Sequence, residues 1–138
     1  MEFSGVNYIA ILVSAVAAMA IGAAWYSTLA KQWVAAVGFS QEQIDEVENG
    51  GNPIIYVFAA LSHLVMAYFL AGVIGHLGQV TISGGLTTAF FLWLGFVVTT
   101  MIVNHRFQMK PWSLTIIDAG HYLAVLLVQG AIIGWFGV

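Results

Sequence analysis

An acidic side chain and an imidazole lie three positions apart inside the apolar run of residues 111–137: Asp118 and His121. In an α-helix this spacing places both side chains on one face, which Gln129 shares two turns later. An ionised carboxylate in hydrocarbon costs roughly 3 kcal/mol or more. Asp118 must therefore face the protein interior or a partner subunit, and be paired or protonated. Proton relays in membrane proteins use titratable groups in such surroundings.

A second histidine, His63, stands in the same local pattern as His121. Each follows a proline by ten residues and precedes a glycine by nine, so the offset is 58 residues throughout. The pattern is either a duplication, giving two parallel helical hairpins related by an axis along the membrane normal, or a chance similarity between apolar helices. If it is a duplication, both imidazoles lie at one depth, about 15 Å inside a hydrocarbon core of roughly 30 Å.

We predict a polar intramembrane site that comprises Asp118, His121, His63 and Gln129. The alternative for each histidine is a structural role, because a buried imidazole often hydrogen-bonds to a neighbouring helix. The other two histidines, His76 and His105, are expected in loops and carry little information about function.

The elements that must position these side chains are membrane helices. Hydrophobic residues make up 61% of the 138 residues and charged residues 7%, which is too little polar surface for a soluble domain. A span needs about 20 apolar residues, and four charge-poor stretches have that length: residues 6–26, 54–74, 83–103 and 113–135. Apolar and polar residues do not alternate in these stretches, as they do in the strands of a membrane barrel. We predict an all-α protein, one domain over residues 1–138, with four transmembrane helices in an up-down bundle.

The few cations predict the orientation of this bundle. Lys31 follows the first span, and Arg106 and Lys110 lie between the third and fourth, so all three share one side. The positive-inside rule makes that side cytoplasmic and places both termini outside.

The polar connector, residues 31–52, is predicted to contain a short cytoplasmic helix. Ser40 followed by Gln43 matches a capping box, and Gly50 and Gly51 end the helical pattern. The acidic side chains of this helix either belong to a solvated connector or form a docking surface for a partner.

Small residues at helical spacing predict close helix packing. They are Ser14, Ala18, Gly22, Gly72, Gly75, Gly130 and Gly134. A single four-helix bundle has little interior in which to shelter the polar site, and such faces invite further helices. We therefore expect a homo-oligomer, most simply a homodimer, in the lipid bilayer.

Several classes of function are excluded or disfavoured. The chain has no cysteine, which excludes thiolate chemistry and cysteine-based metal sites. It has no HExxH, no phosphate-binding loop and no serine motif of a hydrolase. We expect a protein that is not an enzyme, with no nucleic acid as a partner.

Four motifs resemble a known family. They are "GAAWYS" at the end of the first span with "KQW" after it, "LWLGFVVTT" in the third span, and "PW" followed by "IIDAGHYL" in the fourth. In order and spacing they are similar to the bacterial family called domain of unknown function 1761, over nearly the whole chain. The resemblance implies a small integral protein of the bacterial inner membrane and no established activity.

Three functions stay open. The first is a proton-responsive transport or permeation unit built on the Asp/His site. The second is a structural accessory subunit that packs against a larger membrane complex. The third, less favoured, is a subunit that holds haem or a metal between His63 and His121, since two histidines on separate helices can act as axial ligands. Apart from that third function we expect no cofactor.

Overall fold

The four spanning segments are present as long helices. The computed structural model describes residues 3–137, and this part of the chain is all helical, with no strand. Four helices are long and apolar enough to cross a membrane: α1 (Tyr8–Thr28), α4 (Ile54–His76), the segment Ile82–Phe107, and α7 (Trp112–Phe136). The prediction of an all-α membrane protein with four transmembrane helices is confirmed.

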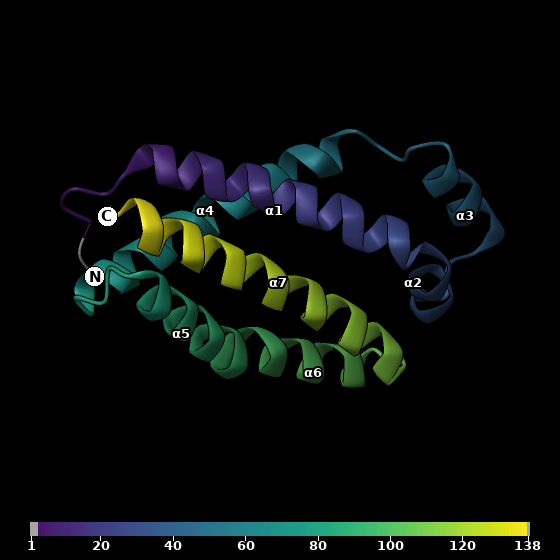
Figure 1. The fold of residues 1–138 in the computed structure, drawn as a ribbon. Helices are drawn as coiled ribbons and strands as arrows, with labels where there is room; N and C mark the ends of the chain where they lie inside the picture. The colour runs from purple at the N-terminus through teal and green to yellow at the C-terminus, as the bar shows by residue number, and fades with distance from the viewer. Residues whose placement is uncertain (1–2, 138) are drawn as a thin grey trace.

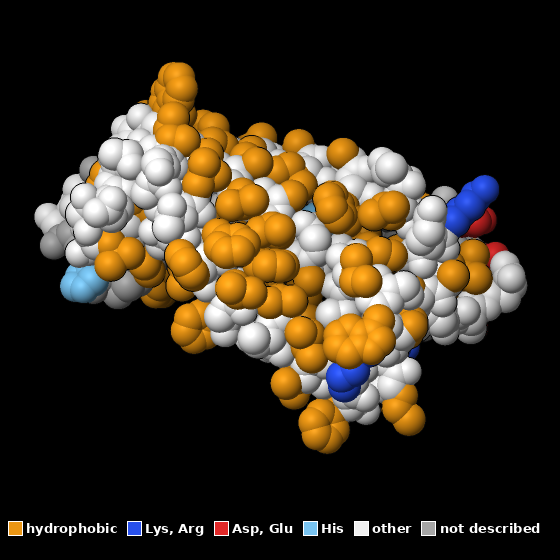
Figure 2. All heavy atoms as spheres, turned by 60° about the horizontal axis from the view of Figure 1, so that its bottom comes forward, with side chains coloured by type: hydrophobic (Ala, Val, Ile, Leu, Met, Phe, Trp, Pro, Cys, Tyr) orange, Lys and Arg blue, Asp and Glu red, His pale blue; other side chains and the backbone are white. Residues whose placement is uncertain are grey.

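These segments run alternately up and down (Figure 1). Both ends of the described chain lie at one end of the bundle, which we call the terminal end. The opposite end holds the connector after α1 and the turn between the third and fourth spanning segments. Lys31 lies in this connector, Arg106 in the last turn of the third segment and Lys110 in the turn that follows, and we call this end the basic end. On the face drawn in Figure 2, the Lys, Arg, Asp and Glu side chains appear at the basic end, while hydrophobic side chains cover the middle. This distribution fits a body whose middle lies in hydrocarbon.

The third spanning segment is longer and less regular than expected. It consists of α5 (Ile82–Leu92), a π-helical turn η1 (Trp93–Val97) and α6 (Val98–Phe107). The expectation that His76 and His105 lie in loops is wrong, because His76 is the last residue of α4 and α6 continues to Phe107. Basic side chains in the last turn stabilise a helix, because a positive charge interacts favourably with the negative end of the helix dipole. His105 and Arg106 also bond to the neighbouring α7, as described below.

The connector holds two helices where one was expected. Helix α3 (Gln41–Glu48) begins with the predicted capping box: the Ser40 hydroxyl accepts from Gln43 N at 3.3 Å, and the Gln43 side chain accepts from Ser40 N at 2.9 Å. A separate helix, α2 (Ala30–Val37), follows α1 directly and ends at Gly38, whose φ of 77° is left-handed. Helix α2 is only eight residues long, so its sequence "AKQWVAAV" is too short to show a clear helical period of apolar residues.

Helix α7 is the central element of the bundle. It packs against α1, α4 and α5, and it is the most buried of the spanning segments, whereas Ile82–Phe107 is the least buried. The apolar core lies mainly toward the terminal end, where Leu126 and Ile133 of α7 meet Leu70 and Ile74 of α4. The opposite half of α7 carries Asp118 and His121.

Glycines bring α5 and α7 into backbone contact. A Cβ placed on Gly130 would lie 2.4 Å from the carbonyl oxygen of Gly85, and one on Gly134 would lie 2.2 Å from that of Thr81. Gly22 faces His121, while Gly72 lies against the ring of Phe3. Ser14 and Ala18 are fully buried on α1, and Gly75 is half-buried on α4. Six of the small residues predicted to pack are therefore either fully buried or in close contact with a neighbouring segment of the same chain.

The contact of Gly130 with Gly85 predicts a sensitive substitution. In Gly130→Ala the new methyl group has no space against the α5 backbone, so we expect a loss of about 1–3 kcal/mol in the free energy of unfolding. The measurement is the melting temperature in detergent. Gly95→Ala is the matched control, because a Cβ there meets nothing within 4 Å. Equal melting temperatures for both variants would contradict the close helix contact.

Candidate functional site

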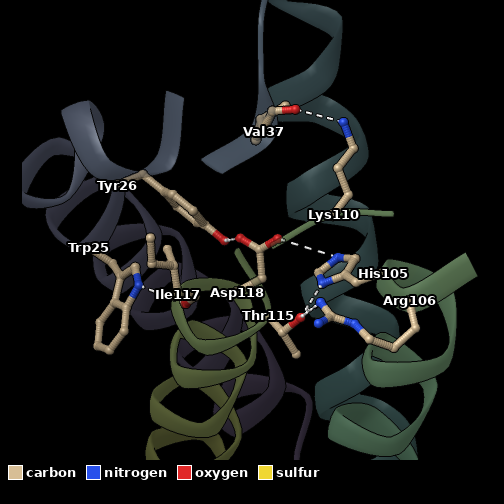
Figure 3. Close-up of polar contacts among 9 residues, drawn as sticks. All are labelled: Trp25, Tyr26, Val37, His105, Arg106, Lys110, Thr115, Ile117 and Asp118. Atoms are coloured by element: carbon tan, nitrogen blue, oxygen red, sulfur yellow. Dashed lines mark hydrogen bonds and ion pairs between the residues drawn. The ribbon is translucent and has the colours of Figure 1, made fainter. Parts of the chain in front are cut away.

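The carboxyl group of Asp118 lies between helices α1 and α6. It projects from α7 about two turns after the start of that helix, and 19% of its side chain is exposed. The hydroxyl group of Tyr26, near the end of α1, donates a hydrogen bond of 2.8 Å to Oδ1 of Asp118 (Figure 3). Tyr26 thus supplies one of the polar partners that a carboxylate at this depth requires.

A second partner comes from α6. Nε2 of His105 lies 3.9 Å from Oδ2 of Asp118, which makes an ion pair when the imidazole is protonated. The other ring nitrogen, Nδ1, lies 2.9 Å from the hydroxyl oxygen of Thr115, and Nη2 of Arg106 donates to the same oxygen at 3.1 Å. Arg106 also stacks on the ring of Trp112, 3.8 Å from its centroid.

Thr115 and His105 contact each other as the nucleophile and base of a hydrolase do. However, Thr115 is only 3% exposed, so a substrate carbonyl has no access to its hydroxyl. The hydroxyl oxygen also accepts from Arg106. This contact therefore ties α6 to α7 and orients the imidazole toward Asp118.

Two further hydrogen bonds fix the backbone around Asp118. The indole nitrogen of Trp25 donates to the carbonyl of Ile117 at 3.0 Å, and Lys110 Nζ donates to the carbonyl of Val37 at 2.6 Å (Figure 3). The first bond holds α7 to α1, and the second holds the α6–α7 turn to α2. The carboxyl group is thereby held in a defined position at the basic end.

The two predicted histidines lie together one turn deeper. The ring centroids of His63 on α4 and His121 on α7 are 6.3 Å apart, and each residue is 5% exposed. Tyr122 lies beside both rings, at 4.8 Å from His121 and 6.4 Å from His63. Gly22 leaves room for the imidazole, since a Cβ there would lie 3.2 Å from Nε2 of His121.

Three nitrogens of this histidine pair have no hydrogen-bond partner within residues 3–137. They are Nδ1 of His63 and both ring nitrogens of His121. A buried polar group without a partner costs about 1–3 kcal/mol. Such groups are rare in native proteins, so these nitrogens are available to a water molecule, an ion or a polar ligand.

Tyr26 joins the two groups of side chains. Its hydroxyl bonds to Asp118, and its ring centroid lies 5.0 Å from that of His121. Asp118 itself makes no hydrogen bond or ion pair with His63 or His121 among the described residues. Of the four residues predicted to form the polar site, the structure brings His63 and His121 together and links Gln129 to His63 through a bond of 3.1 Å from Nε2 to the His63 carbonyl. Asp118 connects to them through Tyr26.

Sequence reasoning missed Tyr26 and His105. Tyr26 fits an interfacial aromatic belt, and nothing in its neighbourhood indicates that its hydroxyl turns inward. The signal for His105 was its position one residue before Arg106, in a segment that can extend the third helix. Within residues 3–137, no three His, Asp or Glu side chains are close enough to hold a metal ion.

Comparison with known proteins identifies a family. The model of a family described as "Protein of unknown function (DUF1761)" matches residues 9–134, which is nearly the whole chain. No curated protein and no solved structure matches the chain.

The bond between Tyr26 and Asp118 predicts an energetic coupling. In a double-mutant cycle of Tyr26→Phe with Asp118→Ala, we expect a coupling of about 1.5–3 kcal/mol, the range for hydrogen bonds to charged groups. The measurement is the free energy of unfolding in detergent. Tyr56→Phe is the control, because Tyr56 is exposed on α4 and should show no coupling to Asp118→Ala. A Tyr26 coupling no larger than that of Tyr56 would remove the bond from the account.

Proposed function

The chain belongs to the DUF1761 family, and from its buried side chains we propose that it is a proton-responsive transport or permeation unit, without enzymatic activity. Protons exchange between the basic end and the buried histidine pair. The observation that supports this most is the double contact of Tyr26, with Asp118 through its hydroxyl and with His121 through its ring.

The titratable side chains form a series that passes through all four spanning segments. In order from the basic end they are His105 on α6, Asp118 on α7, Tyr26 on α1, His121 on α7 and His63 on α4. A phenol hydroxyl both donates and accepts hydrogen bonds, so Tyr26 can exchange a proton with Asp118 while its ring lies beside His121. Counted along α7 from Trp112, Asp118 lies about 9 Å in and His121 about 14 Å in.

Polar groups continue beyond the histidines toward the terminal end. Gln129 and Ser14 are fully buried, and neither Oε1 of Gln129 nor Oγ of Ser14 has a hydrogen-bond partner in the described chain. Gln129 lies about 25 Å along α7 from Trp112. Polar atoms therefore occur at successive depths of the bundle, as a proton path requires.

The proposal includes an orientation and a membrane. Lys31, Arg106 and Lys110 lie at one end of the bundle, and the positive-inside rule makes that end cytoplasmic. Both termini then lie outside, and His105 receives its protons from the cytoplasm. The family resemblance in the sequence favours the bacterial inner membrane.

A structural accessory subunit is the second candidate. The observation in its favour is that the segment Ile82–Phe107 is the least buried of the four, so most of its surface is available to another chain. A homodimer through this segment is compatible with either function. In an accessory subunit, however, the unpaired nitrogens of the histidine pair have no role.

Proton flux into liposomes distinguishes the two candidates. Vesicles that contain the wild-type protein should dissipate an imposed pH gradient faster than empty vesicles. Asp118→Asn removes the titratable charge and keeps the volume. Tyr26→Phe removes the hydroxyl that bonds to Asp118 and keeps the ring beside His121. Each should slow the flux at least about tenfold.

Tyr56→Phe is again the control and should retain the wild-type rate, because its hydroxyl lies outside the series. Wild-type vesicles that are no faster than empty ones would contradict the proposal. That result, together with copurification of a larger membrane complex, would favour the accessory subunit.

A further inference from the structure

A groove of about 410 Å³ opens between α4 and α5 at the terminal end of the bundle. It is far from the polar series, since it begins at the α4–α5 turn and extends along α5 to the π-helical turn η1. Its volume falls at the lower end of the range for small-ligand sites, roughly 300–1,000 Å³.

A tight turn between α4 and α5 forms the part of the groove at the terminal end. A Cβ on Gly84 would lie 2.1 Å from the carbonyl oxygen of Gln79, so the turn folds directly against the start of α5. The hydroxyl of Thr81 accepts from Gly84 N at 3.0 Å and caps the helix. The inner end of the groove reaches Phe96 in η1. Single π-helical turns inside α-helices occur frequently at functional sites.

The polar side chains of the groove lie toward its terminal end, and its deeper end is apolar. Gln79, Thr81, Ser83 and Thr87 lie toward the terminal end beside Leu77, whereas Phe91, Leu92 and Phe96 lie deeper. Thr81 and Phe96 are fifteen residues apart, which corresponds to about 22 Å along the helix. The lining is therefore amphipathic along its length, with hydrogen-bonding groups where the membrane surface would lie.

The lining contains no Lys, Arg, His, Asp or Glu. All three Lys and Arg residues of the chain lie at the opposite end of the bundle. A phosphate head would have no cation to neutralise it here, whereas hydroxyl and amide side chains match a head that carries hydroxyl or carbonyl oxygens.

We propose that this groove is a binding site for one uncharged amphiphile, with a hydroxyl-bearing head and a single acyl chain, of the monoacylglycerol class. The head bonds to Gln79 and Ser83, and the chain lies along Phe91 and Phe96. The site goes beyond the proton-responsive function and does not depend on it.

A cysteine-protection experiment tests the site, because the chain has no cysteine of its own. Thr87→Cys places a thiol in the groove. Leu86→Cys places one at the same depth on α5, outside the lining and 36% exposed before the change. Both proteins are reconstituted in phosphatidylcholine vesicles and labelled with a membrane-soluble maleimide, while monooleoylglycerol or oleoyl lysophosphatidic acid is added.

We expect monooleoylglycerol to slow the labelling of Thr87→Cys at least about fivefold, saturably, and to leave that of Leu86→Cys unchanged. Adding Ser83→Val should raise the amount needed for half-protection about fivefold, the effect of one lost hydrogen bond. Equal protection by the charged lysolipid would overturn the proposal, because bulk lipid alone would then fill the groove. Absence of protection by monooleoylglycerol, in a protein with the wild-type melting temperature, would overturn it as well.

Discussion

The need to hydrogen-bond a carboxyl group within an apolar bundle governs the basic half of this protein. Asp118 receives Tyr26 from α1 on one side and His105 from α6 on the other. Because these partners come from different helices, the position of one side chain fixes how three helices meet. The hydrogen bonds from Trp25 and Lys110 hold the surrounding backbone in place. An interaction of this kind stabilises only when all its members are present.

The terminal half follows a different principle. There α7 approaches α5 at the distance of backbone contact, because Gly130 and Gly85 lack side chains, and the apolar core fills the space beside them. The helices are thus held by close packing at one end and by polar contacts at the other. The histidine pair lies between the close-packed end and the end held by polar contacts. Three of its ring nitrogens have no hydrogen-bond partner within the described chain. We therefore propose this pair as the site where a functional change of protonation occurs.

The sequence allowed the four spans and the capping box of α3 to be predicted, because each depends on local composition or spacing. The extent of α6 could not be predicted, since it depends on bonds of His105 and Arg106 to Thr115 on another helix. The inward turn of the Tyr26 hydroxyl likewise depends on where α1 and α7 meet. Local patterns identify which polar residues lie in the membrane, whereas tertiary contacts decide which of them touch.

The central claim is that Asp118 and the histidine pair respond to protons as one coupled group, with Tyr26 as the link. Nuclear magnetic resonance of the imidazole signals over a pH titration tests it most directly, in the wild-type protein and in Asp118→Asn. The account predicts that the signals of His121 titrate at a different pH in the two proteins. Superimposable curves for His121 would show that the carboxyl group and the buried pair are independent and would contradict the account.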